Sequence, residues 1–139
     1  MKPKFSMWIP EHKLLCLVET IDFAMNGDIA YVMPEIPDPK NPAYRAYDPK
    51  EVVLLLGTGK IDKNGFEIFE GNIIEHKYNS PLSGEEVIHR YQVVWDETFA
   101  MFSAVGIGIR NQTSLNSSAR RFEIIGTIYT DPELLGVEK

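Results

Sequence analysis

Four carboxylates have the side-chain chemistry that catalysis needs. Glu67 and Glu70 lie in one segment of the chain, and Asp96 and Glu97 lie in another. Two carboxylates that converge in a cleft can serve as general acid and general base, which is the chemistry of a small hydrolase. The order of the residues does not bring these groups together, and we interpret them as exposed loop charges. We therefore name no catalytic residue, and a hydrolase with carboxylates in a barrel cleft stays the alternative function.

The residues that most often bind metals do not have ligand spacing in this sequence. His12, His76 and His89 form no H-x-H or H-x-x-x-H pair, and none stands near a cysteine with zinc-ligand spacing. Residues 62–65 read DKNG, like the start of a calcium loop, but the glycine comes too early and Ile73 stands where the loop needs a glutamate. We predict no metal site and no cofactor, and we interpret His76 as a structural histidine on a strand.

Two further segments resemble reactive motifs but lack the required pattern. Residues 57–60 read GTGK, without the spacer and the Ser or Thr of a phosphate-binding loop. Cys16 is the single cysteine and stands in the apolar run 14–18, where a buried, inert thiol is the default interpretation. The arginines between residues 110 and 121 could form a basic patch, but we interpret them as solvated side chains.

One segment has the composition of a binding element. Residues 34–49 contain five of the nine prolines, which hold a chain extended and cannot donate to a β-ladder. A loop of this length in a compact domain is usually functional or disordered. It also carries Tyr44, Arg45 and Tyr47, and Tyr and Arg are enriched at binding hot spots. We predict that these three residues are exposed anchors for a partner, and a tolerated surface insertion is the alternative.

Short apolar segments alternate with turn signals along the chain, and this pattern predicts a mainly β, antiparallel fold. We expect strands near residues 51–56, 73–78, 90–96, 99–109 and 121–130. Little helix is expected. Residues 112–120 are weakly helical, and so is a final turn over 131–136, where Asp131 would be the N-cap.

Two turns are specified by their residue types. Asn64 and Gly65 form the strongest short hairpin signal, because a tight primed turn needs positive φ angles that these residues tolerate. Gly71, in the sequence EGN, marks a second turn. We predict positive φ angles at both glycines. We also predict that Gly126, inside the last strand, leaves room for a bulge or a close backbone approach.

Three segments of the chain resemble one protein family. The central KIDKNGFEIFEGNIIE, the tail EIIGTIYTDPELL and the N-terminal KFSMWIPEHKLL are similar to motifs of the YopX family. The resemblance touches both ends and the middle of the chain and is weak over 24–50, 79–90 and 106–120. The chain departs from the family pattern at Ile9, where an aspartate is usual, and at Asn72, which replaces an aspartate.

The resemblance implies a fold, an origin and a location, but no activity. Members of the family are encoded by bacteriophages and prophages. We therefore expect an SH3-like barrel body and a protein that acts in the cytoplasm of a bacterial host. Since the sequence names no catalytic set, the favoured function is a non-enzymatic accessory protein. Its partner would be a host or phage protein, or a second copy of this chain in a homo-oligomer.

Composition and charge set the remaining bounds. A chain of 139 residues with 44% hydrophobic and 24% charged residues is typical of one soluble globular domain. We divide that single domain, 1–139, into an N-terminal β-rich segment (1–33), a proline-rich loop (34–49) and a barrel-like body (50–135). The formal net charge of −6 disfavours general binding to nucleic acid. We recognise no leader and no apolar run of spanning length, so we expect no membrane partner.

Overall fold

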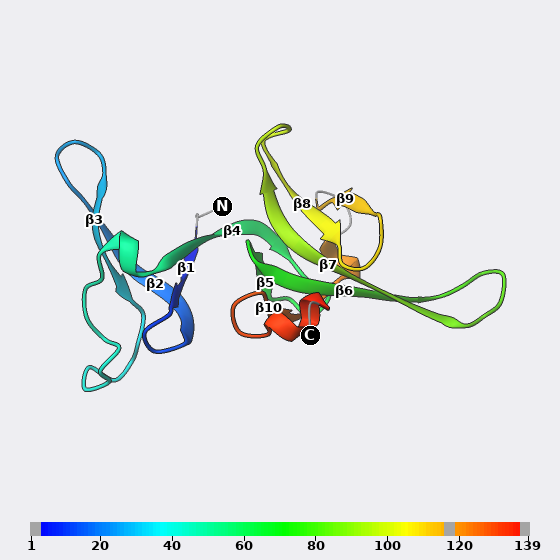
Figure 1. Ribbon diagram of the computed structural model, residues 1–139, viewed down its shortest axis with the longest axis horizontal. Helices are drawn as coiled ribbons and strands as arrows, with labels where there is room; N and C mark the ends of the chain where they lie inside the picture. Colours follow the sequence, from blue (N-terminus) through cyan, green and yellow to red (C-terminus); the bar gives the residue numbers. More distant parts are fainter. Residues whose placement is uncertain (1–3, 116–118, 137–139) are drawn as a thin grey trace. The chain divides into compact units, whose positions relative to one another are not determined.

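The computed structural model describes residues 4–115 and 119–136. Strands dominate it, their pairs are antiparallel, and the described helices are short 3-10 turns (Figure 1). The mainly β prediction is therefore confirmed. The chain divides into two compact units, Met1–Gly57 and Thr58–Lys139, called here the N-terminal and C-terminal units. That the whole chain behaves as one domain stays a prediction.

The first sheet contains the strands of the N-terminal unit. The elements of this unit are β1 (Phe5–Ile9), β2 (Leu14–Phe23), β3 (Ile29–Pro34), the 3-10 helix η1 (Pro49–Glu51) and the start of β4 (Val53–Ile61), which continues into the C-terminal unit. The strand order of the sheet is β3-β2-β1-β4-β5, where β5 (Glu67–Phe69) belongs to the C-terminal unit. Segment 14–23 was ambiguous in sequence and is a strand, because alternate side chains of Leu14, Cys16 and Val18 pack on the core.

The core of the N-terminal unit includes a residue of the proline-rich segment. Its buried members are Met7, Ile9, Val32, Tyr47 and Val52. Val32 and Tyr47 form an isolated antiparallel bridge, and both of its backbone N–H···O distances are 2.9 Å. Residues 34–49 are therefore attached to the sheet close to their C-terminal end.

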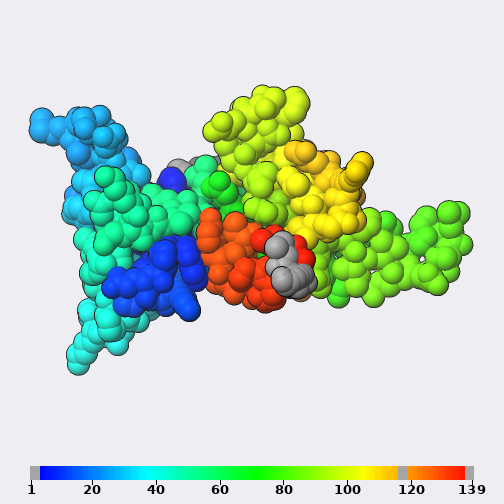
Figure 2. All heavy atoms as spheres, viewed as in Figure 1, coloured from blue at the N-terminus to red at the C-terminus, as the bar shows by residue number. Residues whose placement is uncertain are grey.

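The C-terminal unit contains a second antiparallel sheet of order β10-β6-β7-β8-β9. Its elements are β6 (Asn72–Asn79), β7 (Glu86–Asp96), β8 (Met101–Gly106), β9 (Gln112–Ser114), η2 (Ala119–Arg121), β10 (Glu123–Thr127) and η3 (Pro132–Leu135). Figure 1 shows β6 and β7 continuing as a long ribbon, and Figure 2 shows the turns of the β6–β7 and β7–β8 hairpins standing out from this unit. Long two-stranded ribbons expose more side chains than a closed sheet does.

The core of the C-terminal unit lies on one face of this sheet. Its buried members are Ile68, Ile74, Tyr91, Val93, Ala104, Leu115, Ala119 and Phe122. Among the described residues no strand pairing closes either sheet into a barrel. The SH3-like barrel therefore stays a prediction.

A buried carboxylate organises the first predicted turn. Asp62 is 1% exposed and accepts backbone N–H groups of Asn64 at 2.9 Å, Phe66 at 2.9 Å and Ile124 at 3.1 Å. Gly65 within this turn has φ of 88°, and Gly71 in the second turn has φ of 89°. Both positive-φ predictions are confirmed. The DKNG segment is thus an Asx-type turn, in which the side chain of the aspartate replaces backbone partners.

The predicted irregularity at Gly126 is confirmed. The register between β10 and β6 shifts between Ile124 and Gly126, which is a β-bulge. A Cβ atom at Gly126 would lie 2.5 Å from Asp131 Oδ2. That carboxylate accepts the Thr130 hydroxyl at 2.6 Å and the Thr127 N–H at 3.3 Å, and it makes no cap hydrogen bond to η3. Asp131 is the N-cap residue of η3, as expected, but its side chain is bound to the bulge and does not cap the helix.

Two other expectations about local structure are confirmed only in part. The weakly helical segment 112–120 ends in η2, which contains Ala119 and Arg120. Gln112–Ser114 is instead the strand β9, because it pairs with β8, and residues 116–118 lie outside the described part of the chain. The expected strand at 51–56 begins only at Val53. Asp48 and Glu51 form a capping box that holds the residues before it in η1.

Candidate functional site

The three predicted binding residues do not share one environment. Tyr44 is half-buried and Arg45 is exposed, whereas Tyr47 is only 1% exposed. The Tyr47 hydroxyl donates to the Ala43 carbonyl at 2.8 Å inside the core. The expectation that Tyr47 is an exposed anchor is wrong, since the bridge to Val32 places this residue in the core.

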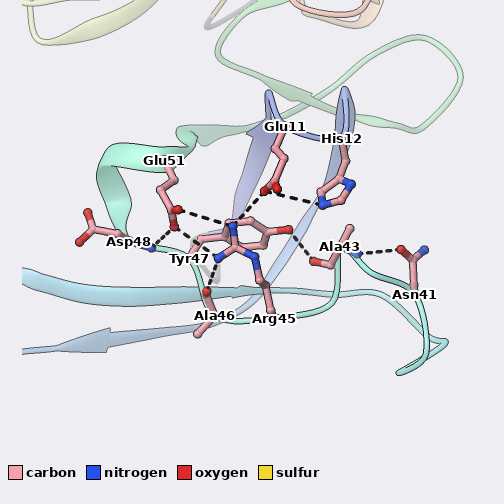
Figure 3. A network of polar contacts seen from close by, with 9 residues as sticks. All are labelled: Glu11, His12, Asn41, Ala43, Arg45, Ala46, Tyr47, Asp48 and Glu51. Carbon is pink, nitrogen blue, oxygen red and sulfur yellow. Dashed lines mark hydrogen bonds and ion pairs between the residues drawn. The ribbon is translucent and has the colours of Figure 1, made fainter.

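Arg45 is held by groups of its own unit (Figure 3). Its guanidinium lies 2.9 Å from Glu11 Oε1 and 3.4 Å from Glu51 Oε1, and its Cζ atom lies 3.9 Å from the centre of the Tyr47 ring. The pKa of Glu51 is lowered first by the hydrogen bond from the Asp48 backbone and then by Arg45. Exposed ion pairs contribute little one at a time. Together with the ring contact, they form a clamp that fixes the proline-rich segment against the core.

Tyr44 lines a hollow in the N-terminal unit. This hollow has a volume of about 410 Å³ and is lined by Glu19, Glu35, Ile36, Pro37, Pro39 and Tyr44. The Tyr44 hydroxyl donates to Glu19 Oε1 across a long distance of 3.4 Å. The lining therefore combines the apolar surface of two prolines and an isoleucine with two carboxylates.

A second hollow meets the first at Glu19 and Glu35. It has a volume of about 470 Å³, and its other lining residues are Lys4, Phe5 and 17–21. The Glu35 backbone N–H donates to the Leu17 carbonyl at 2.8 Å, which attaches the start of the proline-rich segment to β2. Leu17 is 42% exposed. We call the two hollows together the acidic groove.

The C-terminal unit contains a hollow of a different chemical character. It has a volume of about 470 Å³ and is lined by His76, Tyr78, His89, Tyr91, Arg121 and Phe122, together with residues 111–113. These residues come from β6, β7, β9, η2 and the turns beside them. We call this hollow the histidine pocket.

Aromatic rings form the walls of the histidine pocket. His76 stacks on Tyr78 with ring centres 5.0 Å apart, and His89 meets Tyr78 edge-on at 5.8 Å. Tyr91 and Phe122 lie 5.3 Å apart, also edge to face. The β6–β7 register explains this cluster, because His76 is directly opposite His89 and residues two apart in a strand share a face.

Polar groups are added to these walls. Asn111 donates to the Tyr91 hydroxyl at 2.8 Å. The pKa of His76 lies below its ordinary value, first because of partial burial and then because of Arg121 and His89. The neutral form of His76 is therefore favoured. The residues that line the pocket include no carboxylate.

The carboxylates proposed for the alternative hydrolase do not meet in the acidic groove or in the histidine pocket. Glu67, Glu70, Asp96 and Glu97 line neither the acidic groove nor the histidine pocket. Among the described residues no group of three or more His, Cys, Asp or Glu side chains is placed to hold a metal ion. Within that same part of the chain, no helix is long and apolar enough to cross a membrane.

Sequence reasoning missed the histidine pocket. It treated His76 as structural and the arginines near it as solvated. A signal was present, since two strands joined by the turn at 80–85 bring His76 and His89 into one cross-strand pair. The contribution of Arg121 had no such signal, because it reaches the pocket from η2, which is distant in sequence.

The two antiparallel sheets define a mainly β protein with little helix. The chain belongs to the YopX family: the family model described as YopX protein matches residues 4–136. No curated protein sequence matches this chain.

Two solved structures share the fold. Protein EF1440 from Enterococcus faecalis is 22% identical, with a TM-score of 0.64 over 97% of this chain and 99% of that one. Protein yopX from Bacillus subtilis is 16% identical, with a TM-score of 0.59 over the whole of both chains. At these identities the likeness establishes the fold and not the activity.

Proposed function

We propose that this chain is a non-enzymatic binding module that takes a protein partner in the acidic groove of its N-terminal unit. The partner segment is basic and partly apolar. The observation that carries this proposal is the lining of the groove, in which Glu19 and Glu35 lie among exposed apolar side chains of β2 and the proline-rich segment.

Charge complementarity favours a basic segment. The hollow around Tyr44 has two carboxylates and no basic residue in its lining, and Lys4 lines only the neighbouring hollow. A lysine or arginine of a partner would meet both carboxylates there. Ile36, Pro37 and Leu17 supply apolar area beside them, and a proline-rich wall loses little entropy when a partner binds.

The proposal is tested by selection from a random heptapeptide display library on the purified protein. We expect the selected peptides to combine Lys or Arg with apolar residues. A fluorescent copy of a selected peptide would then be titrated against variants. We expect Glu19→Gln/Glu35→Gln to weaken binding about tenfold, since two exposed charge pairs are removed. Tyr44→Ala should also weaken it.

A matched control carries the same change of charge outside the groove. Asp22→Asn/Asp28→Asn removes two exposed carboxylates of the β2–β3 hairpin that line neither hollow. Its affinity should equal that of the wild type. Equal losses in both double variants would contradict the proposal, and so would selected peptides without basic residues. Sedimentation that shows a dimer sensitive to Tyr44→Ala would identify a second copy as the occupant.

We also propose that the chain is encoded by a phage or prophage and acts in the cytoplasm of a bacterial host. The central and C-terminal segments that resemble the family support this origin. Genes for capsid or lysis proteins beside its own would agree with the proposal, and a neighbourhood of ordinary chromosomal genes would contradict it.

A further inference from the structure

The histidine pocket combines features that a structural cluster does not need. Its rings are only partly covered, since Tyr78 is 38% exposed while Tyr91 and Phe122 behind it are 4% and 3% exposed. Exposed polar groups of Asn111 and Arg121 lie at the same hollow. An aromatic floor with a few polar groups around it is the usual construction of a small-molecule site.

We propose that the histidine pocket binds a small ligand that carries a phosphate on a planar ring system, as a mononucleotide does. This site lies in the C-terminal unit and is independent of the acidic groove. Its volume of about 470 Å³ lies within the range of roughly 300–1,000 Å³ that small-molecule pockets have.

Arg121 supplies the charge for a phosphate. Among the described residues it has no carboxylate partner, and no carboxylate lines the pocket to compete with an anion. Arg90 of the same sheet, by contrast, is paired with Glu75 at 2.9 Å. A guanidinium matches a phosphate with two parallel hydrogen bonds, so an arginine at the edge of a hollow can make a specific contact with an anion.

The imidazoles add donors to that charge. His76 and His89 lie opposite each other on β6 and β7, and Arg121 faces them from η2. An imidazole has an N–H group that can donate to a phosphate oxygen. The pKa of His76 is lowered first by partial burial and then by Arg121 and His89. A bound phosphate would oppose that effect.

The ring of the ligand would lie on Tyr78 and His76. These two rings stack on each other with an interplanar angle of 29°, so each ring covers one face of the other and a ligand would stack on an outer face. Nucleobases stack on such surfaces with little dependence on sequence, because every base has a π-face. Asn111, Gln112 and Thr113 border the pocket with hydrogen-bonding groups for the edge of a ring.

The test is a calorimetric titration of the full chain at low salt with four probes. These are a 5′-mononucleotide, the matching nucleoside, ribose 5-phosphate and inorganic phosphate. We expect the mononucleotide to bind at least about tenfold more tightly than any of the other three, because only it engages Arg121 and the rings together. Failure of all four to bind at millimolar concentration would overturn the proposal.

Two variants separate the contributions, and a neighbour serves as control. Arg121→Gln should weaken the mononucleotide about tenfold and leave the nucleoside unchanged. Tyr78→Ala should weaken both about tenfold. Both side chains are exposed, so neither change should unfold the chain. Arg120→Gln removes an adjacent exposed arginine that does not line the pocket. If it weakens binding as much as Arg121→Gln, the proposal is wrong.

A single-stranded oligonucleotide distinguishes a free nucleotide from a nucleic acid. We expect it to bind no more tightly than the mononucleotide, since the net charge of −6 repels a long phosphate backbone. Tight binding of the oligonucleotide without binding of any mononucleotide would overturn the assignment of the pocket to a small ligand. Variants that lose peptide binding in the acidic groove should still bind the mononucleotide, so the experiments test the two proposals independently.

Discussion

Removing the Asp62 carboxylate should destabilise the C-terminal unit more than any other change of one polar side chain that we propose. This carboxylate is 1% exposed and accepts three backbone N–H groups, those of Asn64, Phe66 and Ile124. The third bond connects the turn to β10, 62 residues away in sequence. Asp62→Ala removes all three and leaves a small cavity.

The magnitude follows from the exposure of the three donors. A hydrogen bond to a charged group contributes about 1.5–3 kcal/mol. Asn64 and Phe66 are exposed, so water can replace their lost partner, whereas Ile124 is half-buried and keeps an unsatisfied N–H. We expect Asp62→Ala to cost about 3–5 kcal/mol in the free energy of unfolding. Asp62→Asn keeps one acceptor oxygen and should cost about 1–3 kcal/mol.

Urea unfolding followed by tryptophan fluorescence measures both variants. Asp38→Ala is the control, because Asp38 makes the same kind of turn hydrogen bond, to Lys40 N–H at 2.9 Å, on the surface. Its cost should be below about 1 kcal/mol. The reasoning is refuted if Asp62→Ala costs no more than this control, or if the Asn variant costs as much as the Ala variant.

Three further predictions address other parts of the C-terminal unit. Ser103 Oγ is buried on β8 without a hydrogen-bond partner among the described residues. Ser103→Ala should therefore be neutral or raise the free energy of unfolding by about 1 kcal/mol. A decrease of more than about 1 kcal/mol in urea unfolding would contradict this. Gly71 has φ of 89°, so Gly71→Ala should lower the free energy of unfolding by about 1 kcal/mol or more, and an unchanged melting midpoint would count against the strain argument. His76 should titrate below its ordinary pKa in NMR spectra, because its neutral form is favoured by partial burial, Arg121 and His89. Since the pKa of His76 is lower in the folded chain than in the unfolded chain, the stability that its neutral form contributes is lost as the pH falls below the ordinary histidine pKa. Arg121→Gln should raise the pKa of His76. An unchanged pKa in this variant would show that Arg121 does not face His76.

Local signals in the sequence were sufficient for the turns. Gly65 and Gly71 have positive φ angles, which tight turns require and glycine tolerates. This requirement depends only on the few residues of the turn. Asp62 illustrates the limit of such reasoning. The DKNG motif indicated a turn, but its bond to Ile124 depends on where β10 lies and could not be predicted from the motif.

Burial depended on contacts between distant segments. Tyr47 looked like Tyr44 in the sequence, because both stand in a polar, proline-rich segment. A single bridge to Val32 places Tyr47 in the core, while Tyr44 stays at the rim of the groove. The histidine pocket likewise needs residues from β6, β7 and η2, and the composition of these segments does not predict that they lie side by side.

Chemical-shift mapping of a selected basic peptide on the isotope-labelled protein tests the central claim most directly. The account predicts that backbone amides around Leu17, Glu35 and Tyr44 shift on titration, that these shifts weaken as salt is raised, and that amides of the C-terminal unit stay unchanged. Shifts confined to the C-terminal unit, or the absence of any peptide that perturbs the acidic groove, would contradict it.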